Sequence, residues 1–135
     1  MNLMSMPQLI DIETLCSLPW PDRVRYLDEL RDRLIGLADE DPALEEAPGG
    51  GQVPFDRERR ELGKDWPVSA LSMIGAKRML QLQRAAEFAI EFGVPGDFIE
   101  TGVWRGGACI LMRAVLAARG VTDRRVWVAD SFRGL

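Results

Sequence analysis

The spacing of apolar residues predicts an amphipathic helix near the start of the chain. Between residues 21 and 38, apolar side chains recur every three or four positions and charged residues occupy the positions between them. Pro21 suits the first turn of this helix, because an N–H group there would have no partner within the helix. The apolar stripe consists of Val24, Leu27, Leu30, Leu34, Ile35 and Ala38.

A second long helix is predicted over residues 67–92. Gly93 follows it, at the position where a left-handed residue commonly ends a helix. Residues 55–66 are dense in charge, and we interpret them as a short helix at the surface. The apolar stripe of the second long helix consists of Leu71, Ile74, Leu82, Ala85, Ala89 and Phe92.

Residues 39–54, between these helices, have a different composition. They include five acidic residues, three prolines and three consecutive glycines, so they offer little to bury. We predict a flexible loop that stays mobile without ligand and can act as a lid. The acidic side chains could hold a metal ion, but a solvated charged segment is the simpler interpretation.

After Gly93 the pattern changes to short runs of β-branched and aromatic residues. Residues 97–101 and 125–130 are each predicted to form a strand. Residues 105–119 between them are predicted to form a helix that ends at Gly120. A strand, a helix and a second strand make a βαβ unit, so the two strands should be parallel.

Two parallel strands do not complete a sheet. Strands of a parallel sheet are usually buried on both faces, and an unpaired edge exposes backbone hydrogen-bonding groups. The second strand ends shortly before Leu135, the last residue of the sequence. We therefore expect an α/β fold of which this chain is the N-terminal half.

The turn after the first predicted strand carries groups suited to a nucleoside ligand. Glu100 closes the strand, and Gly102 lets the backbone turn sharply or approach a ligand closely. Gly106 and Gly107 stand near the start of the next helix, where free N–H groups and the helix dipole favour an anion. Asp130 ends the second strand, where a carboxylate can bind ribose hydroxyls or cap the following turn.

The spacing of the glycines excludes two other nucleotide-binding motifs. Three residues separate Gly102 from Gly106, so the G-x-G-x-x-G motif of nicotinamide-dependent dehydrogenases is absent. The Gly-Lys pair at 63–64 is followed by Asp65, and Glu58 takes the place of the first glycine of a P-loop.

Composition narrows the function further. The chain has no histidine, which excludes Ser-His-Asp and Cys-His nucleophilic sites and zinc sites that need imidazole. Its two cysteines fit a reducing cytosol, and its net charge of −4 gives no general attraction for nucleic acid or anionic lipid. No apolar run is long enough for a membrane span and the first residues lack a secretory signal, so we expect a cytoplasmic protein.

Three stretches carry a resemblance to a known family. They are "GDFIETGVWRGGACILMRAVLAARGVTDRRVWVADSFRGL" at 96–135, "DWPVSALSMIGAKRMLQLQ" at 65–83 and the weaker match "RYLDEL" at 25–30. Together they resemble the macrocin O-methyltransferase family, whose members methylate sugar hydroxyls on macrolides and related natural products. The resemblance implies S-adenosylmethionine (SAM) as methyl donor and Mg²⁺ as cofactor.

The same resemblance implies a domain organisation. Residues 67–135 would begin a Rossmann-like class I methyltransferase domain with its first βαβ unit. Residues 1–66 would form a helical N-terminal or lid region that contains the flexible loop at 39–54.

The resemblance also implies which residues bind the donor. By position, the glycine-turn residues would line the methionine part of the pocket, Asp130 would bind the ribose, and the two residues after it would lie near the adenine. Two residues of the preceding helix, which would otherwise be ordinary helix core, would close the site. The full set is Met73, Ile74, Glu100, Thr101, Gly102, Arg105, Gly106, Asp130, Ser131 and Phe132. Without the resemblance, Arg105 would be interpreted as a surface cation.

The chain departs from the family pattern in two respects. Members commonly carry a histidine where this chain has Leu71 followed by Ser72. The metal-binding carboxylates of the family lie in its second half, so we assign no catalytic or metal-binding residue within 1–135.

Three functions remain open from the sequence. The first is part of a SAM-dependent sugar O-methyltransferase that acts on a small glycosylated molecule, with no nucleic-acid or membrane partner and an open oligomeric state. The second is a truncated, non-catalytic paralogue that binds a ligand or a partner. The third is a nicotinamide-dependent oxidoreductase, which the glycine spacing disfavours.

Overall fold

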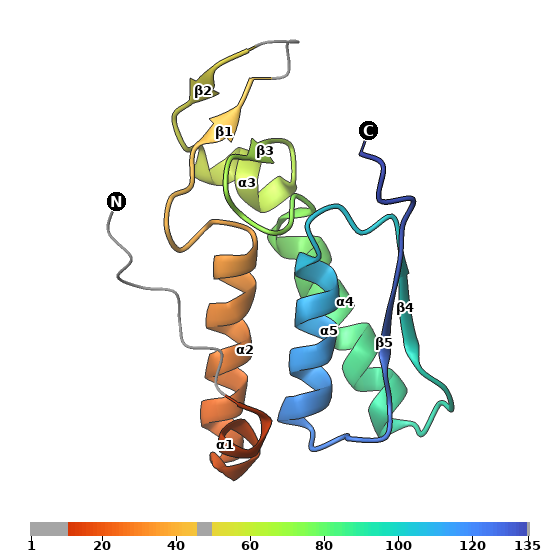
Figure 1. The fold of residues 1–135 in the computed structure, drawn as a ribbon. Coiled ribbons are helices and arrows are strands. Elements are labelled where there is room, and N and C mark those ends of the chain that lie inside the picture. Colours follow the sequence, from red (N-terminus) through yellow and green to blue (C-terminus); the bar gives the residue numbers. More distant parts are fainter. Residues whose placement is uncertain (1–10, 46–49, 135) are drawn as a thin grey trace.

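The structure is a computed structural model that describes residues 11–45 and 50–134 (Figure 1). Residues 1–10, residues 46–49 of the predicted loop, and Leu135 lie outside this description. The helices are α1 (Ile12–Ser17), α2 (Trp20–Leu34), α3 (Arg57–Leu62), α4 (Gly75–Glu91) and α5 (Gly107–Ala118). The strands are β1 (Ala43–Leu44), β2 (Gln52–Val53), β3 (Trp66–Pro67), β4 (Phe98–Thr101) and β5 (Val126–Ala129).

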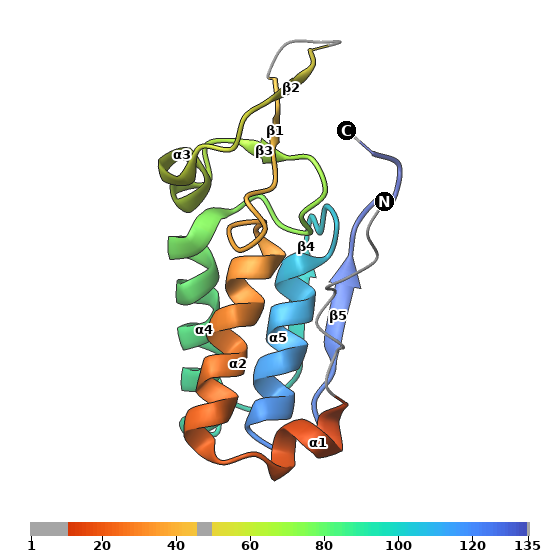
Figure 2. The same ribbon diagram turned by 90° about the vertical axis from the view of Figure 1, so that its left-hand side faces the viewer.

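Helix α5 lies between α2 and the strand pair β4–β5, and α4 packs beside α2 and α5 (Figures 1 and 2). The two strands are parallel, and the register runs from Phe98 opposite Val126 to Thr101 opposite Ala129. Helix α5 is the crossover between them. The predicted βαβ unit is therefore confirmed.

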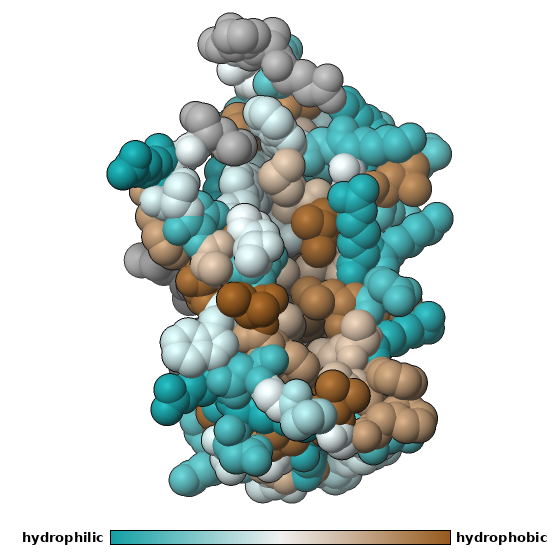
Figure 3. All heavy atoms as spheres, turned by 90° about the vertical axis from the view of Figure 1, so that its right-hand side faces the viewer, coloured by the Kyte–Doolittle hydropathy of each residue, from teal (hydrophilic) through white to brown (hydrophobic). Residues whose placement is uncertain are grey.

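The helices cover one face of this two-stranded sheet. Phe98 packs toward the core, so the alternation of side chains places Ile99 on the other face, where it is 64% exposed. Trp127 lies opposite Ile99 in the register and is also exposed. Figure 3 shows this side of the molecule, where brown apolar side chains stand among polar ones. Among residues 11–45 and 50–134, no helix is both long and apolar enough to cross a membrane.

One hydrophobic core joins residues on both sides of the boundary predicted between 66 and 67. Within α2, the stripe residues Leu27, Leu30 and Leu34 are buried, as the spacing predicted. Ala38 is exposed, because α2 ends at Leu34 and the chain turns. The buried members of the core are Leu15, Leu27, Leu30, Leu34, Ile35, Leu37, Met79, Ala86, Leu111, Val115, Ala117 and Ala118.

The second long helix is shorter than predicted, since α4 begins at Gly75. Residues 67–74 instead form an irregular segment, which we call the strap. The strap is not helical because its N–H groups bond to distant partners: those of Leu71 and Ser72 donate to the carbonyl of Leu34. The predicted stripe is accordingly wrong in part, because the buried face of α4 carries Gly75, Met79, Gln83 and Ala86, whereas Leu71, Ala85 and Phe92 are exposed.

The stretch 39–54 also differs from the predicted loop. Strand β1 pairs antiparallel with β2 on one side and with β3 on the other. Asp41 and Ala43 are buried: the Asp41 carboxylate accepts from the amides of Ser69 and Ala70, and Ala43 pairs with Pro67 of β3. The ends of the stretch are therefore structured, while its role as a lid stays a prediction.

The charged helix predicted within 55–66 exists as α3, but one of its charged residues is fully buried. Arg60 pairs with the buried Asp65 at 2.9 Å. Its guanidinium also donates to the carbonyls of Ile35, Gly36 and Asp41. Arg60 therefore ties α3 to the end of α2 and to the start of β1, a role that the sequence analysis missed.

Candidate functional site

The carboxyl ends of β4 and β5 lie side by side, and each strand runs there into a turn (Figure 1). Residues 102–106, which we call the glycine turn, follow β4 and lead into α5. Residues 130–134 follow β5. The amide of Gly102 donates to the carbonyl of Ala129 at 2.9 Å, which extends the pairing of the strands to the edge. The predicted site residues of both strands are thus brought together.

Both turns contain backbone conformations that side chains rarely adopt. Trp104 and Phe132 have φ values of +52° and +54°, although neither residue is a glycine. Such conformations cost free energy and cluster at ligand-binding and active sites. Gly102 and Gly106 also have positive φ, and an added Cβ at either would meet no protein atom within 4 Å. The space beside these two glycines is therefore open to a ligand.

Asp130 joins the two turns. One of its carboxylate oxygens accepts from the amide of Val103 at 2.6 Å, and the other accepts from the amide of Phe132 at 3.0 Å. These hydrogen bonds hold the pKa of the Asp130 carboxyl below its usual value. The carboxylate is therefore ionised at neutral pH, and each oxygen keeps room for a further hydrogen bond. Asp130 thus caps its turn and can still accept from a ligand.

The residues after Asp130 are exposed at the same edge. Ser131 lies within 3.4 Å of the Asp130 carboxylate, and the side chain of Phe132 is 74% exposed. Thr101, at the end of β4, is also exposed. An aromatic ring and a carboxylate side by side suit a base and a ribose, respectively.

Glu100 turns toward α5 and contacts a buried thiol. The Cys109 Sγ donates to the Glu100 carboxylate at 2.9 Å. Burial, together with the hydrogen bond and the negative charge of Glu100, raises the pKa of the Cys109 thiol to about 12. The sequence analysis assigned Cys109 no role, although its place in the first turn of α5 and beside the strand end could have suggested one.

The start of α5 is occupied by the protein itself. The amide of Gly107 donates to the carbonyl of Leu71 in the strap at 2.9 Å, and the amide of Gly106 donates to Val103 at 3.0 Å. An added Cβ on Gly107 would lie 2.6 Å from the Leu71 oxygen, so only glycine fits there. The N–H groups of Gly106 and Gly107 therefore already have acceptors within the protein, while binding of an anion at this helix start stays a prediction.

Arg105 is exposed, but its guanidinium lies against the strap. Its Nη1 donates to the carbonyls of Pro67, Val68 and Ala70, at 3.2, 2.9 and 3.1 Å. Its guanidinium also stacks over the Trp104 ring, 4.2 Å from the centroid. These contacts give Arg105 a set of partners that the sequence did not indicate.

Met73 and Ile74 lie at the end of the strap and directly before α4, not inside a helix as predicted. Both are half-buried, and Ile74 packs against the main core. Leu71 and Ser72, the two residues that precede Met73, contact Gly107 at the start of α5.

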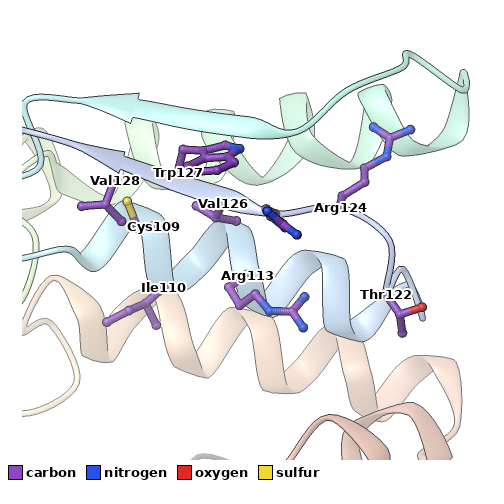
Figure 4. Close-up of a pocket in the computed structure, with 9 residues that line it drawn as sticks. Cys109, Ile110, Arg113, Thr122, Arg124, Val126, Trp127 and Val128 are labelled. Carbon is purple, nitrogen blue, oxygen red and sulfur yellow. The ribbon is translucent and has the colours of Figure 1, made fainter.

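An open groove of about 650 Å³ lies elsewhere, along α5 and β5, and Figure 4 shows its lining. None of the predicted site residues lines it. The candidate site therefore rests on the geometry of the strand ends. Across the two described ranges, no group of three or more cysteine, aspartate or glutamate side chains could hold a metal ion.

Comparison with known proteins gives a consistent result. The chain is 49% identical over 114 residues to a demethyldecarbamoylnovobiocin O-methyltransferase from Streptomyces niveus, which covers 84% of this chain and 44% of that protein. It is 57% identical over 83 residues to a mycinamicin III 3''-O-methyltransferase from Micromonospora griseorubida, over 62% of this chain and 33% of that one. The chain thus spans less than half the length of the curated relatives it matches.

A solved structure extends the likeness to the fold. The structure of the O-methyltransferase NovP superposes with a TM-score of 0.77 at 49% identity, over 84% of this chain and 44% of that chain. The sequence profile of the macrocin O-methyltransferases (TylF) matches residues 15–135, which is most of the sequence. The matched residues include the glycine turn and the two parallel strands. The chain therefore belongs to the macrocin O-methyltransferase family.

Proposed function

We propose that this chain forms the SAM-binding part of an O-methyltransferase that acts on a sugar hydroxyl of a macrolide or related natural product. The observation that carries the proposal is Asp130, an ionised carboxylate at the end of β5, hydrogen-bonded to the glycine turn of a methyltransferase family member. The relatives named for O-methylation of novobiocin and mycinamicin precursors support the acceptor class.

The residues present fit an adenosyl cofactor. When bound, SAM supplies an electrophilic methyl group for transfer to a hydroxyl oxygen. Asp130 accepts hydrogen bonds from the ribose hydroxyls, while Ser131 and Phe132 flank the adenine. The open side of Gly102 lets the ligand approach the backbone closely. The remaining proposed contacts are Met73, Ile74, Glu100, Thr101, Arg105 and Gly106.

The turns contribute by being fixed before the ligand arrives. The Asp130 carboxylate holds the amides of Val103 and Phe132, so the two turns keep their spacing without ligand. Preorganised groups lose less conformational entropy on binding than mobile ones. We infer that this bridge orients the cofactor for in-line transfer.

Magnesium, a small glycosylated acceptor and a cytoplasmic location are part of the proposed function. No residue of the described ranges is proposed as a ligand of the metal.

A thermal-shift comparison tests the proposal on the full-length protein. SAM and its demethylated product, S-adenosylhomocysteine, should each raise the melting temperature more than NAD⁺ does, because the glycine turn lacks the dinucleotide spacing. A larger shift with NAD⁺ would contradict the methyltransferase proposal.

A further inference from the structure

We propose that Arg105 and Asp41 are positioning residues, which clamp the strap from two sides and thereby set the shape of the cofactor site. The inference rests on the proposed function and deepens it. Neither residue needs to touch the cofactor for this role. Both hold the backbone of the strap, and the strap in turn contacts the glycine turn.

Asp41 forms one side of the clamp. Its carboxylate is buried and accepts from the Ser69 amide at 2.9 Å, the Ser69 hydroxyl at 2.7 Å and the Ala70 amide at 2.9 Å. The backbone of Asp41 is itself fixed, since its carbonyl accepts from the buried Arg60 at 2.7 Å. A buried carboxylate with three donors is strongly held, because losing any of them leaves it undersolvated.

Arg105 forms the other side. The amides of Ser69 and Ala70 donate to Asp41, while the carbonyls of Pro67, Val68 and Ala70 accept from Nη1 of Arg105. Residues 67–70 are therefore held by two charged residues that are 64 positions apart in sequence. Because Arg105 belongs to the glycine turn, this clamp joins the strap directly to the proposed site.

The next residues of the strap transmit its position to α5. The carbonyl of Leu71 accepts from the amide of Gly107, and the Cβ of Ser72 would lie 2.7 Å from a Cβ added at Gly107. The strap and the start of α5 are therefore packed too closely to move independently. A displaced strap would therefore move the start of α5 and the glycine turn with it, and small misplacements at a binding site are costly.

This role is distinct from direct recognition of the donor's carboxylate by Arg105. Recognition of a carboxylate by two parallel hydrogen bonds needs the planar guanidinium, and lysine replaces it poorly. Donation to three carbonyls from one nitrogen can be taken over by a lysine ammonium, which carries three N–H donors. The two roles therefore predict different outcomes for Arg105→Lys.

The experiment measures the SAM dissociation constant of the full-length protein by calorimetry, together with hydrogen exchange of the Ser69, Ala70 and Gly107 amides without ligand. Asp41→Asn and Arg105→Gln should each weaken SAM binding by about tenfold and speed up the exchange. Arg105→Lys should keep the dissociation constant within about threefold. Arg57→Gln, at an exposed position of α3, is the matched control and should change neither quantity.

The double variant Asp41→Asn, Arg105→Gln separates the two roles of Arg105. If both residues act through the strap, either single substitution already frees the strap. The double variant should then bind SAM only slightly less tightly than the single variant with the larger loss of affinity. Additive losses with unchanged exchange, or a loss with Arg105→Lys equal to that with Arg105→Gln, would overturn the inference.

Two further results distinguish a failure of this inference from a failure to fold and from a failure of the proposed function. If Asp41→Asn fails to fold, Ser69→Ala removes one bond of the same clamp and should raise exchange at Ala70. If the wild-type protein does not bind SAM, the proposed function fails, and exchange alone decides the clamp. Unchanged strap exchange in Arg105→Gln would then overturn it.

Discussion

Arg60 and Asp130 are charged residues at junctions between elements, but their surroundings are opposite. Arg60 is fully buried, and its guanidinium donates to Asp65 and to four backbone carbonyls. Asp130 is exposed, accepts two backbone amides, and stands beside two turns with strained backbone conformations. Both fix backbone geometry, but only Asp130 keeps acceptor capacity toward open space.

The difference between Arg60 and Asp130 shows how burial and hydrogen bonding distinguish a structural charged residue from one that can bind a ligand. A buried charge with partners on every side stabilises one arrangement and offers nothing to a ligand. An exposed carboxylate that is held by hydrogen bonds on one side keeps its other lone pairs in a fixed direction, where a ligand can donate to them. In this chain the strap connects the two regions, because Arg60 fixes Asp41, Asp41 holds the strap and the strap contacts Gly107.

The largest effect is expected from Arg60→Met. The substitution leaves the buried Asp65 carboxylate and four carbonyls without the donor Arg60, so the free energy of unfolding should fall by about 3–5 kcal/mol. Arg57→Met on the same helix should cost less than about 1 kcal/mol, because its ion pair with Glu61 is exposed. Urea unfolding of both variants checks the contrast. Equal losses would show that the buried pair is not structurally special.

A second substitution sharpens this prediction. Adding Asp65→Leu to Arg60→Met removes both buried charges, so part of the lost stability should return. A double variant that is less stable than Arg60→Met alone would contradict the account of this pair.

A smaller effect is expected from Gly107→Ala. The new Cβ would lie 2.6 Å from the Leu71 oxygen, so the strap or α5 must shift, at a cost of about 1–3 kcal/mol. Gly51→Ala is the control, since an added Cβ there meets no atom within 4 Å and φ is not positive. Thermal unfolding of the two variants should separate them. If Gly107→Ala were as stable as the control, the close contact between strap and helix would be wrong.

The pH dependence of stability should report on Asp130. Its pKa is lowered in the folded protein by the amides of Val103 and Phe132, so its contribution to stability is fully present above its unfolded pKa of about 3.9. The contribution is lost as the pH falls through the lower folded value. The stability difference between wild type and Asp130→Asn should therefore shrink below about pH 4. A difference that grows on acidification would contradict this assignment.

The smallest effect concerns the Cys109 thiol. Because its pKa is raised to about 12, only a minute fraction is thiolate at pH 8, and alkylation by iodoacetamide should be slow in the folded protein. Glu100→Gln removes the negative charge beside the sulfur and should speed up the reaction. Mass spectrometry of the modified peptide measures both rates. Fast labelling of Cys109 in the folded wild type would contradict its buried, Glu100-bonded position.

Local sequence patterns predicted the βαβ unit and its glycine ends correctly. The helix end at Gly93 and the end at Gly120 both show positive φ, because a residue without a Cβ takes up that conformation at least cost. The pairing of the strands followed from the short crossover. These features depend on interactions between residues close in sequence, so the spacing of apolar residues and glycines is enough to predict them.

The strap and the burial of Arg60 could not be predicted in the same way. The strap has a helical pattern, but its N–H groups bond to Asp41 and Leu34, about 30 or more positions away in sequence. Arg60 stands in a run of charges typical of a solvated helix, and only the fold supplies its partners. The residues of the candidate site lie at the ends of β4 and β5, whereas the partners of Arg105 and Gly107 come from the strap.

Titration of SAM into wild type and Asp130→Ala, at a temperature well below both melting points, tests the central claim most directly. The account predicts that wild type binds SAM and that the variant binds about ten- to a hundredfold more weakly, because the ribose loses its charged acceptor. The melting temperature should also fall, since the amides of Val103 and Phe132 lose theirs. Unchanged SAM affinity together with a lower melting temperature would reduce Asp130 to a cap of its turn and contradict the cofactor site proposed at the ends of β4 and β5.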